Sequence, residues 1–329
     1  GTDWVGMQRA PQVSTDVQMT VNGLVARVRV QQRFRNPTAA WAEGIYTFPL
    51  PDDAAVDRLL MRYAGRVVEG EIQPREEARK TYEKAKSAGQ GSSLVEQQRT
   101  NVFSTSVANI PPGEAVEIAI HYQQAVDWQA HTFGLRFPMV VAPRYIPGKP
   151  LAPAHPPSVG WLPATDQVPD AAAISPPVVA GADADLNPLS LSIDLNAGIE
   201  LAAIDSRYHP IVTEHLGKGR YRISLQDGRV ATDRDFLIEW RPVPGQGPKA
   251  ALFTEQWQNA HYSLLLVMPP ALDAEREGSG IDRELVLVVD TSGSMHGGSL
   301  EQARSALRKA LTSLGPGDRF NVIQFNSRV

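Results

Sequence analysis

Near its amino end the chain carries a turn signal flanked by alternating apolar residues, and this feature restricts the possible folds most strongly. Asn22 and Gly23 both accept positive φ, so together they favour a tight type I′ β-hairpin turn. Apolar residues occupy alternate positions on both sides of this pair: Val17, Met19, Val21, Leu24, Ala26, Val28, Val30 and Phe34. A two-residue turn pairs Val21 with Leu24 and gathers the apolar residues on one face. The sequence therefore predicts a half-buried antiparallel hairpin over residues 17–34.

Further segments with strand character follow as far as residue 145. They cover residues 45–48, 55–63, 66–72, 102–107 and 116–122. One helix is expected among them, after Pro74, because Ala78, Tyr82 and Ala85 recur at helical spacing and Gly89 provides an end. Many short strands separated by turn residues indicate an all-β sandwich or barrel.

The organisation changes after residue 146. Residues 147–188 contain ten of the chain's 26 prolines, which indicates a linker or a long extended connection. The next strand patterns could form a small second β unit or could return to the first domain, and the sequence allows both. Proteolysis within the proline-rich stretch is expected to release a β-rich piece that ends near Pro147.

The last 48 residues show a different pattern. Residues 285–289 form a continuous apolar run, as expected of a strand buried on both faces. Residues 299–314 have an apolar stripe at helical spacing, and residues 320–325 resemble another strand. Strand, helix and strand in this order are typical of the βαβ unit of an open α/β sheet.

We therefore expect a multidomain chain of 329 residues. An all-β, sandwich-like domain with one helix occupies residues 1–146, and a proline-rich linker occupies residues 147–188. Additional β strands occupy residues 189–272, and the first part of an α/β, Rossmann-like domain occupies residues 273–329.

Composition excludes several classes of protein. The net charge is −4 and there is no basic stripe, which argues against nucleic-acid binding. The absence of cysteine excludes disulfides, thiolate zinc sites and cysteine nucleophiles. The longest uninterrupted aliphatic runs have five residues, whereas a membrane-spanning helix needs about twenty. No membrane span is therefore expected in this segment.

The strongest functional signal is the polar loop Asp290-Thr291-Ser292-Gly293-Ser294, which lies between the apolar strand and the helix. In open α/β sheets, loops at the carboxyl ends of strands bind ligands. The Asp290 carboxylate and the Ser292 and Ser294 hydroxyls are hard oxygen donors that suit Mg²⁺. In the alternative interpretation the loop is a polar turn in which Asp290 accepts hydrogen bonds from local N–H groups. The residue types alone do not decide between the two.

Two stretches of sequence resemble known families. "LVLVVDTSGS" at residues 285–294, with the helix and strand that follow, resembles the start of a von Willebrand factor A (VWA) domain. Upstream, "NGLVARVRVQQRFRNPTAAWAEGIYTFPLP" and "VVEGEIQPREEARKTYEKAKSAGQGSSLVEQQRTNVFSTSVANIPPGE" resemble a VIT domain, the module that precedes the A domain in inter-alpha-trypsin inhibitor heavy chains. With its excess of arginine over lysine, the chain is most similar to proteobacterial VIT–VWA proteins, some of them described as sortase targets.

This resemblance implies a metal-ion-dependent adhesion site with Asp290, Ser292 and Ser294 as metal ligands. The cofactor would be Mg²⁺, or another divalent cation such as Mn²⁺ or Ca²⁺. Later loops of the family supply a threonine and an aspartate, so metal binding is expected to be weak or absent in this chain, and we expect the gene to continue beyond Val329.

The function implied is that of a non-enzymatic, extracytoplasmic adhesion protein of the cell envelope or surface. Its partner would be a protein that offers an acidic side chain to the bound cation. The alternatives are a metal-dependent, phosphatase-like enzyme that uses Asp290 and a purely structural envelope module. The sequence leaves the partner's identity, the mode of anchoring and the oligomeric state open.

Overall fold

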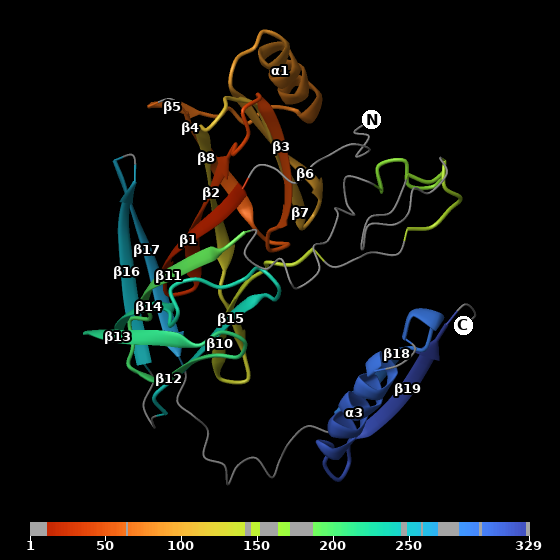
Figure 1. The fold of residues 1–329 in the computed structure, drawn as a ribbon. Coiled ribbons are helices and arrows are strands. Elements are labelled where there is room, and N and C mark those ends of the chain that lie inside the picture. Colours follow the sequence, from red (N-terminus) through yellow and green to blue (C-terminus); the bar gives the residue numbers. More distant parts are fainter. Residues whose placement is uncertain are drawn as a thin grey trace. The chain divides into compact units, whose positions relative to one another are not determined.

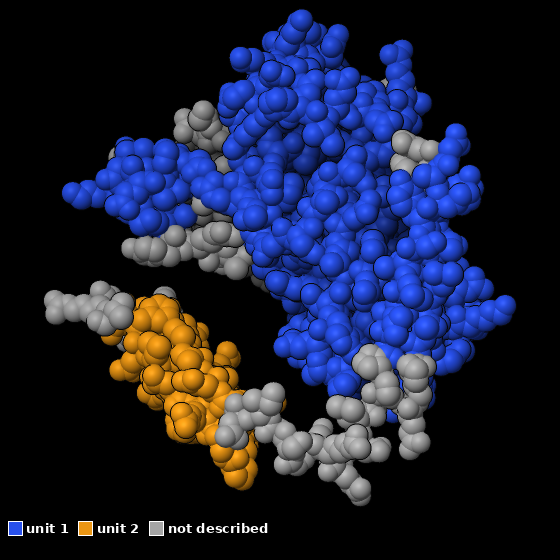
Figure 2. All heavy atoms as spheres, turned by 180° about the vertical axis from the view of Figure 1, so that it is seen from behind, with its two compact units in different colours: residues 1–270 blue, residues 271–329 orange. Residues whose placement is uncertain are grey.

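The computed structural model describes residues 12–63, 65–141, 146–151, 164–171, 187–244, 249–257, 259–268, 283–295 and 298–326. The chain divides into two compact units, residues 1–270 and residues 271–329, which are coloured separately in Figure 2. Among the described residues, no helix is both long and apolar enough to cross a membrane. The multidomain, β-rich architecture expected from the sequence is confirmed.

An eight-stranded sheet forms the largest part of the first unit (Figure 1). Its strands, in spatial order, are β13 (Ile211–Gly217), β14 (Arg220–Leu225), β11 (Leu189–Asn196), β1 (Gln12–Asn22), β2 (Val25–Arg35), β8 (Ala115–Ala125), β4 (Ala55–Tyr63) and β5 (Arg66–Glu69). Neighbouring strands are antiparallel with one exception, because β1 and β11 run parallel.

The β1–β2 hairpin is present, but its turn lies one residue further along the chain than predicted. Gly23 and Leu24 form the turn, and Val21 pairs with Ala26 instead of Leu24. Only Gly23 has positive φ, at +58°, which is the pattern of a type II′ turn. The predicted pairing was wrong because a shift of two positions, from Leu24 to Ala26 as the partner of Val21, leaves the same side chains on the buried face. The apolar pattern is therefore compatible with both pairings. The apolar pattern therefore fixes the buried face but does not fix the register.

The strands that follow the proline-rich stretch return to the first domain. β11 lies beside β1 over eight residue pairs, from Thr15 opposite Leu189 to Asn22 opposite Asn196 (Figure 1). Side chains reinforce this contact, since the Thr15 hydroxyl donates a hydrogen bond of 2.8 Å to the Asn187 side chain. Of the two arrangements that the sequence allowed, the structure has the second. Most of residues 147–188 lie outside the described residues, so the predicted linker and its boundaries stay predictions.

Two smaller sheets and a hairpin complete the first unit. One sheet has the order β3 (Ala42–Pro49), β7 (Val102–Ile110) and β6 (Ser92–Arg99). The other has the order β12 (Leu201–Ser206), β15 (Phe236–Pro242), β10 (Thr132–Phe137) and β9 (Asp127–Gln129). The hairpin consists of β16 (Lys249–Trp257) and β17 (Ala260–Met268).

A single hydrophobic core joins all of these sheets. Strands from the eight-stranded sheet contribute Val28, Ile120 and Ile193, each at most 1% exposed. The smaller sheets contribute large aromatic side chains, among them Phe103 and Trp240. Because one cluster contains residues from both sides of the proline-rich stretch, neither part of the chain forms this core alone.

The predicted helix is α1 (Arg75–Ser87), which follows Pro74. Gly89, with φ of +72°, lies just beyond its end. Tyr82 is buried with Leu94 and Ala108 in a small second cluster. Arg75 and Arg79 both form ion pairs with Glu96 on β6, so the charged face of the helix is tied to the adjacent sheet.

The second unit is the predicted strand–helix–strand arrangement. β18 (Glu284–Asp290) runs parallel to β19 (Arg319–Phe325), and α3 (Gly298–Thr312) connects them. The expected burial of β18 on both faces is wrong for the described residues, because Val286 and Val288 are 51% and 61% exposed. The described part of this unit has one long helix, which covers one face of a sheet only.

The pairing of β1 with β11 predicts the behaviour of a nicked chain. Cleavage at a protease site engineered into residues 153–158 should leave both fragments in one sheet, because they share a core. Gel filtration under native conditions should therefore give a single peak at the elution volume of the uncut chain. Two bands on a denaturing gel would verify the cut, and two native peaks would contradict the shared sheet. This outcome replaces the release expected from the sequence.

A buried histidine makes the stability of the first unit depend on pH. His209 is 5% exposed, packs against the Phe236 ring at 5.8 Å, and its Nδ1 has no hydrogen-bond partner among the described residues. Burial lowers the pKa of His209, and the Arg234 charge lowers it further, while Asp233 acts in the opposite direction. The unfolded chain, with a histidine pKa of about 6.5, therefore takes up this proton first as the pH falls.

We accordingly expect the free energy of unfolding to be fully retained above about pH 6.5 and to decrease as the pH falls from there towards the lowered folded-state pKa. His209→Gln cannot titrate, so it should reduce the slope of stability against pH between about pH 6.5 and 5. Urea denaturation at several pH values measures this slope. His261→Gln, at an exposed position on β17, is the matched control, and an unchanged slope in His209→Gln would contradict the prediction.

Candidate functional site

The polar loop predicted to bind a metal lies at the carboxyl end of β18. Asp290 is the last residue of that strand and lies opposite Phe325, the last residue of β19. Thr291 holds the loop to the neighbouring strand, because its N–H and its hydroxyl both donate hydrogen bonds to the Phe325 carbonyl oxygen, at 2.8 and 3.0 Å. The loop therefore begins at the carboxyl edge of a parallel strand pair, where ligands bind in α/β sheets.

Within the loop the chain turns tightly around Asp290. Its Oδ1 accepts a hydrogen bond of 2.8 Å from the Ser292 N–H, and the side chain is half-buried. The Ser292 carbonyl oxygen in turn accepts a hydrogen bond from the Met295 N–H, which closes a short 3₁₀ turn over Gly293–Met295. The capping interaction considered as the alternative to a metal site is thus present.

This capping does not exhaust the carboxylate. An ionised carboxylate has about four acceptor positions, and in the described part of the chain the Ser292 N–H occupies one of them. Asp290 and Ser292 are joined directly, and Ser294 follows within the same 3₁₀ turn, although its side chain lies outside the described part. A carboxylate and two hydroxyls are the hard oxygen donors that Mg²⁺ prefers, so the donor set fits this ion. The assignment of Asp290, Ser292 and Ser294 as metal ligands stays a prediction.

Acidic and histidine side chains do not form a metal site elsewhere in the described ranges, where no three of them lie close enough together to hold an ion.

A clamp at the opposite end of the two strands fixes their register. The Arg283 guanidinium donates two hydrogen bonds to Asp318 Oδ2, at 2.6 and 3.0 Å, and the Arg283 N–H donates to Asp318 Oδ1 at 2.9 Å. The Gly315 N–H donates to the same carboxylate at 2.8 Å. These hydrogen bonds, chiefly those from Arg283, hold the pKa of Asp318 well below its usual range.

This clamp was not predicted, although the Gly315-Pro316-Gly317-Asp318 turn is a sequence signal for a side chain that hydrogen-bonds to its own backbone. The clamp acts on the pairing of β18 with β19. Arg283 and Asp318 directly precede Glu284 and Arg319, the first residue pair of the two strands. Because both strands start together, both also end together, and this places Asp290 beside Phe325.

Comparisons with known families match both parts of the chain. The family described as "Vault protein inter-alpha-trypsin domain" matches residues 12–122. The family described as "von Willebrand factor type A domain" matches residues 285–329. The second match includes the whole of the Asp290 loop.

Several curated proteins are similar over most of this chain. Human protein mono-ADP-ribosyltransferase PARP4 is 28% identical over 309 residues, covering 92% of this chain and 16% of that protein. Rat von Willebrand factor A domain-containing protein 5A is 26% identical, covering 97% of this chain and 39% of that protein. Mouse inter alpha-trypsin inhibitor, heavy chain 4 is 22% identical, covering 95% of this chain and 30% of that protein. The chain thus spans less than two fifths of the length of these relatives.

Solved structures are much more distant. A putative nutrient-binding protein from Legionella pneumophila aligns with a TM-score of 0.35 and 10% identity, over 70% of this chain and 67% of that one. The two family matches identify a VIT domain at residues 12–122 and the start of a von Willebrand factor A domain at residues 285–329, and the relatives that are similar over most of the chain include VWA-domain and inter-alpha-trypsin inhibitor heavy chain proteins.

Proposed function

We propose that this protein is a non-enzymatic binding protein whose A domain holds a partner through a divalent cation. Asp290, Ser292 and Ser294 would hold the cation, and an acidic side chain of the partner would complete its coordination. The observation that carries this proposal is the position of Asp290. Its half-buried carboxylate ends a parallel strand and, among the described residues, accepts a single hydrogen bond, in a loop rich in hydroxyl groups.

The chemistry of the loop suits a bridging role. A single carboxylate leaves a net positive charge on a divalent ion, so an incoming carboxylate gains both a ligand bond and an opposite charge. Mg²⁺ keeps several waters when few protein ligands are present, and these are the positions that a partner can take. The Ser292 N–H holds the Asp290 carboxylate in place before the ion binds, which reduces the entropic cost of assembling the site.

The first unit would then act as a scaffold or docking module. Its shared core makes it one compact unit, and the binding domain follows it along the chain. We place the protein outside the cytoplasm, in the cell envelope or at the cell surface, and the bacterial, sortase-target assignment belongs to the same proposal. The enzymatic name of PARP4 does not extend to this chain, which covers 16% of that protein. Fractionation of the native host tests the localisation.

Metal binding can be measured on this chain directly. Mn²⁺ should bind with a dissociation constant no tighter than about 10⁻⁴ to 10⁻³ M, the range of weak extracellular calcium modules. Asp290→Asn should weaken binding at least about tenfold, because it removes the only charged ligand but retains an oxygen that can accept the Ser292 N–H. Electron paramagnetic resonance of free Mn²⁺ gives the bound fraction.

Glu301→Gln is the matched control, since Glu301 is an exposed acid in the first turn of α3. It removes the same charge from the same unit and should leave the affinity unchanged. Equal affinities for the wild-type chain and Asp290→Asn would contradict the site.

Partner binding requires the full-length protein and a pull-down from its native environment, with Mg²⁺ and with a chelator. Retention that needs the cation and is lost in Asp290→Asn supports the bridge. Retention that survives both treatments removes the metal from the mechanism. Metal-dependent hydrolysis of p-nitrophenyl phosphate that is abolished by Asp290→Asn would instead favour the phosphatase-like alternative.

A further inference from the structure

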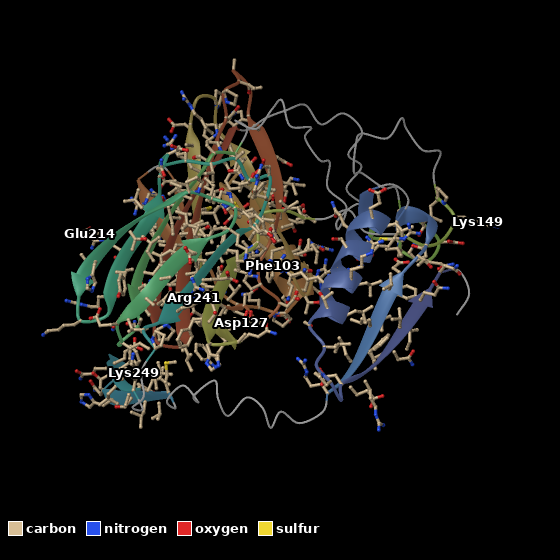
Figure 3. The ribbon with its side chains drawn as sticks, turned by 90° about the horizontal axis from the view of Figure 1, so that it is seen from below. Phe103, Asp127, Lys149, Glu214, Arg241 and Lys249 are labelled. Atoms are coloured by element: carbon tan, nitrogen blue, oxygen red, sulfur yellow. The ribbon has the colours of Figure 1, made fainter. Side chains whose placement is uncertain are left out.

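The outer face of the β12–β15–β10–β9 sheet is hollowed between charged side chains. The hollow has a volume of about 480 Å³, within the usual range for ligand sites. Its lining includes Asp127, Gly134, Asp205, Arg207, Glu239 and Arg241. Figure 3 labels two of these, Asp127 on β9 and Arg241 on β15.

Four of the lining residues form one row across the sheet. Asp205 lies opposite Glu239, Glu239 lies opposite Gly134, and Gly134 lies opposite Asp127. Directly opposed residues share a face, so three carboxylates point outward in a line that is interrupted only by a glycine. The residues next to them along the strands, such as Phe133 and Trp240, are buried in the core and hold the row in place.

Two of the three carboxylates are already neutralised. Arg207 donates to both oxygens of Glu239, at 3.0 and 3.2 Å, and Arg241 donates to Asp205 at 3.4 Å. Asp127 differs, because the described part of the chain offers its carboxylate neither a hydrogen bond nor an ion pair. One negative charge at the edge of the hollow is therefore available to a ligand.

Gly134 is the second observation that points to a ligand. It lies inside β10, where glycine weakens a strand, and its φ does not require glycine. A Cβ built on it would meet a single neighbouring atom, the Asp127 Cβ, at 4.0 Å. The fold therefore has room for a side chain here and leaves the space empty. Glycine at such a strand position often marks the close approach of a ligand.

We propose that this hollow binds an arginine side chain of a partner polypeptide, independently of the metal loop. The guanidinium would lie over Gly134, with the Asp127 carboxylate as its acceptor. A planar guanidinium suits this place because it makes two parallel hydrogen bonds to a carboxylate and packs flat against a surface without a side chain. The row of carboxylates supplies one more negative charge than the two arginines neutralise, so the hollow attracts a cation.

The test is an NMR titration of the ¹⁵N-labelled chain with N-acetyl-arginine amide. The amide resonance of Gly134 reports binding, and it is identified by its loss from the spectrum of the Gly134→Ala variant. N-acetyl-citrulline amide has the same shape without the charge. Saturable shifts with the arginine compound, and none with the citrulline compound, are expected. Asp127→Asn should weaken the affinity about fivefold, the size of an exposed ion pair. Gly134→Val should abolish binding by filling the hollow, with no loss of thermal stability.

Glu214→Gln is the matched control, because it removes an exposed carboxylate from β13, which belongs to the eight-stranded sheet (Figure 3). It should leave the affinity unchanged. Equal shifts with the arginine and citrulline compounds would overturn the proposal, as would binding that survives both Asp127→Asn and Gly134→Val. Free arginine that binds more than tenfold more tightly than the blocked compound would replace the partner polypeptide with a small molecule.

Discussion

The parallel contact between β1 and β11 is the constraint on which the first unit depends. It joins residues more than 170 positions apart and places strands from both sides of the proline-rich stretch in one sheet. A polar seam supports it, in which Asn187 accepts from the Thr15 hydroxyl and donates to the Tyr46 hydroxyl at 2.6 Å. Burial raises the pKa of Tyr46 to about 12, although the Asn187 hydrogen bond acts against this rise. Tyr46 therefore remains a neutral member of the seam at physiological pH.

In both candidate binding sites, a carboxylate accepts fewer hydrogen bonds from the described residues than its oxygen atoms allow. Among the described residues, the Asp290 carboxylate accepts one hydrogen bond, from the Ser292 N–H, and the residues that follow it in the loop carry hydroxyl groups. Asp127 has no partner in the described part, although its neighbours in the row are paired with arginines. The first arrangement suits a metal ion in our proposal, because its residue types, a carboxylate and two serine hydroxyls, are hard oxygen donors. The second suits a guanidinium, because a glycine keeps the adjacent surface flat.

Local patterns predicted much of the secondary structure and the candidate loop. Helix α1, the β1–β2 hairpin and the strand–helix–strand of the second unit follow from apolar periodicity and turn residues, which act over a few positions. The β9–β10 hairpin was missed, because it turns at Ala130 and His131. Both have positive φ, and neither is a residue type that signals such a turn.

The sequence by itself determined which faces are apolar, where the helices lie and which loop carries hard oxygen donors. The exact register of β1 with β2, the return of β11 to β1 and the row of Asp127, Gly134 and Glu239 were decided by the tertiary structure. The physical reason is the range of the forces involved. Periodicity records burial along one strand, whereas register and cross-strand rows depend on which distant strands pack together to close a common core.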